Sequence, residues 1–259
     1  MDVLYSILTG TLIYSTAIII ASLGGLFSER GGIVNIALEG LMMFGGFAGG
    51  AAIIWFEPAF AEGSVIAPLL AIVVGALVGG LVSLIHAYLS VNIGADQVIS
   101  GTAINLLAAG VTVYLSQIIF GSQRTPTYKT GFTKETIPLL SKIPVIGDIF
   151  FTKIYITVYL AFILVIVSWY VINKTKFGLR LRAAGENPHA VDSMGINVYK
   201  LRYTGVIISG LLAGLAGAVM ILTFDNQYAI FSINGTGFIA LAALIFGKWH
   251  LRILMTSLT

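Results

Sequence analysis

Polar side chains within apolar runs are the residues of this chain that could bind a polar solute. Asn35 and Glu39 lie in the apolar run that follows Gly31-Gly32. They are four residues apart, so we expect them to share one face of a helix. An ionisable group inside a membrane span is costly and usually faces an interior cavity, which makes Glu39 a candidate for a substrate pathway. The alternative is that Glu39 hydrogen-bonds to a neighbouring helix or lies near an interface.

The glycine pair Gly31-Gly32 precedes this polar set. It predicts a break in the chain or a helix that begins within the bilayer. A helix N-terminus at that depth would present free N–H groups and a partial positive charge to a polar ligand.

A second polar set opens the apolar run that begins near residue 97. Asp96 is expected to be the N-cap of this span. Gln97, Thr102 and Asn105 lie deeper and offer neutral hydrogen-bonding groups. Such groups suit a ligand with several hydroxyl or amide groups, and they suit hydrogen bonds between helices equally well.

Several chemistries are excluded by the residue types present. The chain contains no Cys, which excludes disulfides, thiolate metal sites and cysteine catalysis. His86, His189 and His250 do not have the spacing of a metal site. No constellation of Ser, His and Asp supports hydrolysis, and no phosphate-binding loop of the P-loop type is present. We therefore expect this chain to be neither an enzyme nor a metal or cofactor protein.

The elements that position these residues are membrane spans. The chain is 58% hydrophobic and 10% charged, whereas a soluble domain has about a quarter charged residues. Apolar runs of about 18 residues or more recur along its length, which is typical of transmembrane helices. We predict an all-α, polytopic transmembrane bundle that forms a single domain over residues 1–259. The predicted spans are 6–27, 33–56, 65–89, 97–120, 154–172 and 201–223.

A seventh apolar piece, 236–247, is too short to cross a hydrocarbon core of about 30 Å as a helix. We predict a half-helix or re-entrant segment, which is tolerated where the backbone is buried in protein or lines a cavity. Other apolar runs contain glycine pairs four residues apart, which favour close packing of helices. These pairs are Gly46 and Gly50, Gly75 and Gly79, and Gly210 and Gly214.

The placement of basic residues predicts the orientation of the bundle. The net charge of +3 is explained better by positive cytoplasmic loops than by binding to nucleic acid. Loop 173–202 is rich in Lys and Arg and is predicted to be cytoplasmic. Loop 121–153 is external by alternation, although it also carries basic residues.

A short capped helix is expected at the centre of loop 173–202. Asn187 is a suitable N-cap, and Pro188 suits the first helical position. Gly195 can end the helix in a left-handed conformation. About two helical turns are too short to be stable alone, so this helix needs a surface on which to dock.

Three motifs together resemble one family of membrane proteins. They are GGIVNIALEGLMMFGGFAG (31–49), ADQVISGTAINLLAAG (95–110) and FGLRLRAAGENPHAVDSMGINV (177–198). They resemble the inner-membrane permeases of bacterial ABC importers for simple sugars, nucleosides and branched-chain amino acids. The resemblance is greatest to the smaller permease subunit of the nucleoside branch, and it covers residues from about 5 to 249.

The resemblance implies the partners of this chain. Two permeases form the pathway in membrane lipid, a separate ATPase binds ATP and Mg, and a lipoprotein delivers the substrate. It also implies that the short helix couples the permease to the ATPase. The implied coupling residues are Ala184, Gly185, Glu186, Asn187, Pro188, Ala190 and Gly195.

Two other function classes compete with this interpretation. A self-sufficient secondary transporter or channel for small polar solutes would need coupling-ion ligands or an inverted repeat, and we find no convincing repeat. An intramembrane enzyme lacks a plausible nucleophile and base.

The C-terminus departs from the family pattern. Such permeases continue after the equivalent of His250 with a Pro/Gly-rich turn and further spans, whereas this sequence continues as LRILMTSLT. The resemblance therefore implies a bundle that is incomplete at its C-terminus.

Overall fold

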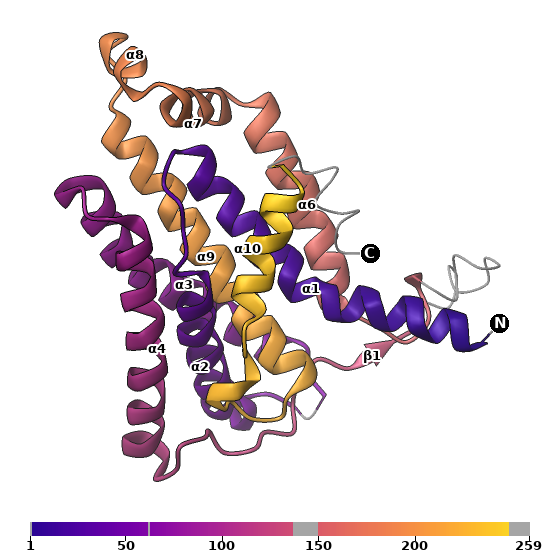
Figure 1. The fold of residues 1–259 in the computed structure, drawn as a ribbon. Coiled ribbons are helices and arrows are strands. Elements are labelled where there is room, and N and C mark those ends of the chain that lie inside the picture. Colours follow the sequence, from indigo (N-terminus) through magenta and orange to yellow (C-terminus); the bar gives the residue numbers. More distant parts are fainter. Residues whose placement is uncertain (1, 62, 137–149, 249–259) are drawn as a thin grey trace.

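The computed structural model describes residues 2–61, 63–136 and 150–248. Within them, six helices are long and apolar enough to cross a membrane. This finding confirms the predicted helical bundle of six full spans (Figure 1). The six are α1 (Asp2–Arg30), α2 (Leu38–Phe56), α3 (Ile66–Ala87), α4 (Gln97–Phe120), α6 (Ile156–Lys174) and α9 (Val198–Phe224).

Helix α9 packs against α1, α2 and α3 through small residues. A Cβ added at Gly79 would lie 2.5 Å from the carbonyl oxygen of Gly210, and one added at Gly214 would lie 2.4 Å from that of Gly75. No side chain fits at these distances, so the two backbones are in direct contact. The predicted packing role of these glycine pairs is confirmed.

The start of α2 differs from the prediction. The helix begins at Leu38, and residues 31–37 form a non-helical connection from α1. Gly32 has a φ of +81°, and the N–H groups of Gly31 and Ile33 both donate to the carbonyl of Ser28. The predicted chain break is therefore confirmed. The prediction that Asn35 shares a helix face with Glu39 is wrong, because this turn delays the helix until after Asn35.

The end of α3 also has a feature that the sequence did not predict. The helix continues into a wide π-helical turn, η2 (Tyr88–Ile93), which ends at Gly94 with a φ of +70°. The hydroxyl of Tyr203 on α9 donates to the side chain of Asn92 on this turn. Turns of this kind are often found at functional sites.

Loop 173–202 contains two helices, α7 (Lys176–Glu186) and α8 (Pro188–Ser193). The sequence analysis predicted only the second. Thr175 is the N-cap of helix α7, because its hydroxyl accepts a hydrogen bond from the Gly178 N–H. Its face with Leu181 is buried against the bundle, and this packing stabilises a segment that looks polar in the sequence.

The seventh apolar piece forms helix α10 (Thr236–Phe246), preceded by the short turn η3 (Ile230–Ser232). Its 11 residues extend over about 16 Å, roughly half the hydrocarbon thickness. Ser22 of α1 donates to the carbonyl of Ala240. The predicted half-helix is confirmed. The sequence after residue 248, on which the expected C-terminal departure depends, lies outside the described residues.

The connector that follows α4 packs across one end of the bundle, opposite α7 and α8 (Figure 1). The Tyr128 hydroxyl lies 2.8 Å from the carbonyl oxygen of Ile221 and 2.7 Å from that of Asp225. Two short strands, β1 (Lys134–Glu135) and β2 (Ile154–Tyr155), pair in antiparallel fashion. The sequence predicted a loop at β1, but at β2 it predicted the start of the membrane span 154–172. Residues 137–149 of the loop lie outside the described residues.

Candidate functional site

Glu39 holds the N-terminus of α10. Its side chain is only 4% exposed. One carboxylate oxygen accepts from the Gly235 N–H at 2.6 Å, and the other accepts from the Gly237 N–H at 2.7 Å. The first N–H groups of a helix have no partner within the helix, and they carry its partial positive charge. The carboxylate therefore provides acceptors for two N–H groups at the start of α10. This contact is the hydrogen bond to a neighbouring helix that the sequence analysis gave as the alternative to a substrate pathway.

Helices α2 and α10 begin beside each other at this carboxylate. A Cβ added at Gly237 would lie 2.5 Å from the backbone nitrogen of Glu39. Glu39 is itself in the first turn of α2. Two helix N-termini thus meet at one buried anion within the bundle, which is the arrangement that broken transmembrane helices use around polar solutes.

Asn35 ties the non-helical connection to α9. It is fully buried, its Nδ2 donates to the Ser209 hydroxyl at 2.7 Å, and its Oδ1 accepts from the Ala37 N–H at 3.1 Å. Ser209 lies about 16 Å along α9 from Val198. The polar contact is therefore deep in the bundle rather than at its end.

Two further polar residues that bond to this connection come from α4. The Gln97 Oε1 accepts from the Val34 N–H at 2.7 Å. Asn105 donates to the Ile36 carbonyl at 3.0 Å and accepts from the Gly40 N–H at 2.7 Å. A non-helical backbone at membrane depth needs such partners, because lipid supplies none. The structure thus brings Gln97 and Asn105 together with Asn35 and Glu39.

His86 also bonds to the connection 31–37, and the sequence analysis did not predict this contact. It is fully buried in α3, with one ring nitrogen 3.0 Å from the Ser100 hydroxyl and the other 3.2 Å from the Val34 carbonyl. The signal that could have found it is an ionisable side chain near the end of an apolar run, which requires a polar partner.

Unlike Gln97 and Asn105, Thr102 forms its hydrogen bonds within α4. Its side chain is exposed on α4, and its hydroxyl bonds to the carbonyls of Val98 and Ile99 in the same helix. The surrounding face of α4 is apolar and exposed, with Leu106 and Tyr114 among its side chains. Of the five residues predicted to line a pathway, Asn35 thus lies in the connection 31–37, Gln97 and Asn105 bond to it, and Glu39 follows it in the first turn of α2.

We call the polar groups around residues 34–40 the polar layer. Asn35, Glu39, His86 and Ser209 in it are buried, and Gln97 and Asn105 are half-buried. It combines one carboxylate, three amides and two helix N-termini. Its hydrogen bonds are internal to the protein, so a solute that passes here would have to exchange them for its own. The layer suits a neutral solute with both donors and acceptors.

The short helix α8 has the caps that its sequence predicts. The Asn187 Oδ1 accepts from the Ala190 N–H at 3.1 Å, and Pro188 is the first helical residue. At the other end Gly195 has a φ of +74°, its N–H donates to Asp192, and the N–H of the following residue donates to the Val191 carbonyl. This pair of hydrogen bonds is the Schellman arrangement.

Helix α8 docks on its neighbours through one apolar side chain. Val191 is buried against Ala184 of α7 and Val198 of α9. The opposite side is exposed and includes Ala190, while Met194 is 76% exposed. Met194 lies in the turn after α8, and the sequence analysis did not name it.

Two of the predicted coupling residues lie away from this exposed side. Ala184 is fully buried, and a Cβ added at Gly185 would lie 2.4 Å from the carbonyl oxygen of Arg30. Both face the membrane helices. Glu186 and Asn187 are exposed where α7 meets α8.

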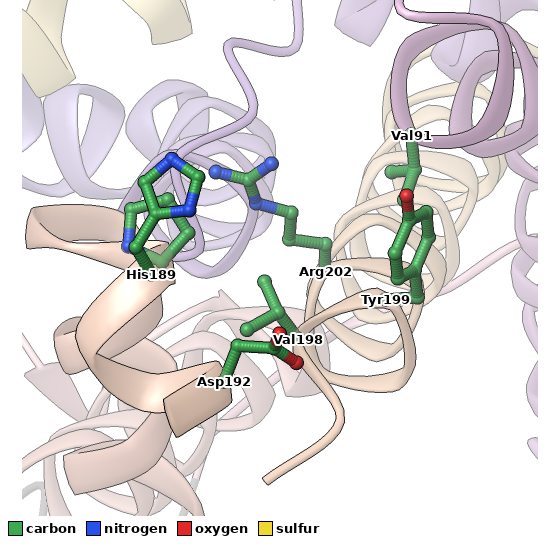
Figure 2. Close-up of a pocket in the computed structure, with 7 residues that line it drawn as sticks. Val91, His189, Asp192, Val198, Tyr199 and Arg202 are labelled. Carbon is green, nitrogen blue, oxygen red and sulfur yellow. The ribbon is translucent and has the colours of Figure 1, made fainter. Parts of the chain in front are cut away.

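A groove of about 320 Å³ separates α8 from the start of α9 and from η2 (Figure 2). His189 and Asp192 of α8 lie on one side of it, and Tyr199 and Arg202 of α9 lie across from them. Its walls are partly apolar, through Val91, Pro188 and Val198. The groove is therefore lined by both charged and apolar side chains.

Comparison with known proteins adds to this geometry. Residues 7–258 match the family model described as branched-chain amino acid transport system / permease component. The guanosine ABC transporter permease protein NupQ of Bacillus subtilis is 47% identical over 96% of this chain and 77% of its own length. The nucleoside ABC transporter permease protein NupC of Lactococcus lactis is 46% identical, over 96% and 78%. The putative glucose ABC transporter permease protein TsgC13 of Haloferax volcanii is 34% identical, over 94% and 71%. No solved structure matches the chain.

Proposed function

Since this chain belongs to the family of branched-chain amino acid transport system permease components, we propose that it is the membrane-spanning subunit of an ATP-driven importer for nucleosides. The relatives named as guanosine and nucleoside permeases support this substrate class. The chain is a multi-pass protein of the plasma membrane.

The observation that carries the proposal is the capped helix α8 at one end of the bundle. It is too short to be stable alone, yet it has both caps and an exposed outer side that includes the apolar side chain of Met194. Such a surface suits a protein partner. Lys and Arg residues surround it, which supports a cytoplasmic location and hence an ATPase as the partner.

The polar layer supports a neutral, hydrogen-bonding substrate. Nucleosides carry ribose hydroxyls and base edges that both donate and accept. The amides of Asn35, Gln97 and Asn105 can exchange their internal hydrogen bonds for such groups, and Glu39 can accept from a hydroxyl.

Three further proteins complete the proposed importer. A second permease forms the other half of the pathway, a cytoplasmic ATPase binds ATP and Mg, and a lipoprotein delivers the nucleoside. One relative, the guanosine ABC transporter permease protein NupP of Bacillus subtilis, is 31% identical to this chain. Its name matches that of NupQ, which supports a pair of different permeases.

The test is uptake by the assembled importer. The chain is co-expressed with its second permease, the ATPase and the lipoprotein, and the complex is reconstituted into liposomes. Radiolabelled guanosine, glucose and leucine are then offered with and without ATP. We expect uptake of guanosine that requires ATP.

ATP-driven uptake of glucose or leucine instead of guanosine would contradict the substrate class. Guanosine uptake by liposomes that contain this chain alone would indicate a self-sufficient transporter and contradict the proposed dependence on an ATPase.

A further inference from the structure

Two glycines bring the cytoplasmic helix pair into backbone contact with the connection between α1 and α2. A Cβ added at Gly185 of α7 would lie 2.4 Å from the Arg30 carbonyl oxygen and 3.1 Å from the Gly32 nitrogen. In the other direction, a Cβ added at Gly32 would lie 3.1 Å from the Gly185 Cα. At these distances no side chain fits between the two backbones, so they are in direct contact.

On one side of this contact, Gly185 is linked closely to α8. The neighbouring residue Ala184 is fully buried and packs in one cluster with Val191 of α8. Only Asn187 separates α7 from α8, and its side chain caps α8. A displacement of α8 therefore displaces Gly185 as well, because close-packed groups transmit movement rather than absorb it.

On the other side, Gly32 leads directly into the polar layer. Val34 and Asn35 follow it, bound to Gln97 and Ser209. The connection then enters α2, where Glu39 holds the N-terminus of α10. Six residues thus separate Gly32 from the buried carboxylate of Glu39.

We propose that the Gly185–Gly32 contact is the positioning contact that passes movement of α7 and α8 to the polar layer. When a bound partner moves α8, the connection 31–37 moves with it, and Glu39 shifts relative to α10. The inference rests on the proposed function, since it takes the ATPase as the partner that moves α8. Gly185 acts through Gly32 and does not touch the substrate.

The first test measures the number of guanosine molecules transported per ATP hydrolysed by the full complex. Gly185→Ala places a methyl group against the Arg30 carbonyl and forces α7 away from the connection. We expect this ratio to fall by about tenfold, which is within the usual range of coupling between sites. Gly110→Ala is the matched control, because a Cβ at Gly110 meets nothing within 4 Å.

A Gly185→Ala complex that transports as many molecules per ATP as the Gly110→Ala complex would overturn the inference. That outcome would leave the proposed function intact. A complex of the unaltered chain that fails to hydrolyse ATP or to take up guanosine would instead contradict the proposed function.

A second measurement keeps Gly185 in place, so it decides the question even if Gly185→Ala fails to assemble. The chain has no Cys, so pairs of spin labels can be attached at chosen positions in the complex with cysteine-free partners. One pair joins Ser193 of α8 to Val34 of the connection. The reference pair joins Ser193 to Thr133 at the opposite end of the bundle. All three residues are exposed.

If the contact transmits movement, the distance between labels at 193 and 34 stays constant when ATP binds, while the distance between 193 and 133 changes. A distance between 193 and 34 that changes as much as the reference distance would overturn the inference.

Discussion

At the scale of single residues, Glu39 is the most informative side chain of this protein. Its position within an apolar run suggested a substrate pathway, and its hydrogen bonds to Gly235 and Gly237 give it a structural role as well. The two roles are compatible, because a carboxylate that holds a helix N-terminus is also a site where a solute hydroxyl can compete. We therefore propose that Glu39 links the stability of α10 to transport.

Replacing Glu39 with Gln should weaken this link without removing it. The amide oxygen still accepts one of the two hydrogen bonds, but its NH₂ group faces the other N–H. Hydrogen bonds to charged groups contribute about 1.5 to 3 kcal/mol, so we expect a loss of about 2 kcal/mol in the free energy of unfolding and a modest loss of uptake. Thermal unfolding in detergent and guanosine uptake measure these effects.

Glu135→Gln is the matched control, because Glu135 is an exposed carboxylate on β1 and should change stability by no more than about 0.5 kcal/mol. Equal melting temperatures for the two variants would show that Glu39 does not hold α10.

At the scale of elements, the design depends on helices that begin at defined points. Asp96 caps α4, Asn187 caps α8, and Asn197 caps α9. Each side chain accepts a hydrogen bond from a backbone N–H group in the first turn of its helix. Long helices such as α9 are held mainly by packing, whereas α8 has six residues and one buried side chain. The cap therefore matters most at α8.

We predict that Asn187→Ala weakens binding of the ATPase. Loss of an N-cap costs about 1 kcal/mol, which lowers the equilibrium constant for forming the docking conformation of α8 by about fivefold. Asn187→Asp keeps an acceptor and should restore binding. The amount of ATPase that co-purifies with the permease measures the effect.

Asn173→Ala serves as the control, since the Asn173 side chain bonds within the last turn of α6 and caps no helix. The same loss of ATPase in both Ala variants would contradict the role of the cap.

The crossing of α3 and α9 supports a second prediction at this scale. Gly79→Val would place a branched side chain where even a Cβ lies 2.5 Å from the Gly210 carbonyl. We expect the helices to separate, with a loss of at least about 3 kcal/mol and little monodisperse protein on size-exclusion chromatography. Gly110→Ala should elute as the unaltered protein does, because its Cβ meets nothing within 4 Å. A normal elution profile for Gly79→Val would show that this crossing tolerates a wider spacing.

At the scale of the whole molecule, the two ends of the bundle differ. One end carries α7 and α8, and the other end is covered by the connector after α4. Glu57, which follows α2, holds this connector by accepting hydrogen bonds from the backbone N–H groups of Lys129 and Thr130. Both ends carry basic residues, so charge alone does not separate them. The proposed orientation, with α8 in the cytoplasm, therefore needs a direct test.

Single cysteines in the Cys-free chain test this orientation. Met194→Cys and Thr133→Cys lie at opposite ends and are both exposed. A membrane-impermeant maleimide added to intact cells is expected to label position 133 and to leave position 194 unlabelled until the cells are opened. Labelling of position 194 in intact cells would reverse the proposed orientation.

The sequence by itself determined the elements that depend on local chemistry. Apolar length predicted six spans and the half-helix α10, and Asn187, Pro188 and Gly195 predicted both ends of α8, because caps use only neighbouring backbone groups. The glycine pairs predicted close helix packing, because the absence of a side chain is known from the residue type alone.

Only the tertiary structure decided which distant groups meet. Asn35 precedes α2 rather than lying on it, and its partner Ser209 is 174 residues away. Helix α7 looks polar in sequence and is stabilised by burial of its Leu181 face against the bundle. The partners of Glu39 are backbone N–H groups, which every residue except proline has, so no sequence pattern marks Gly235 or Gly237 as its ligands. Hydrogen bonds to backbone N–H and C=O groups leave no signal in the residue type of the partner, and in this protein Glu39, Gln97 and Asn105 all bond to such groups.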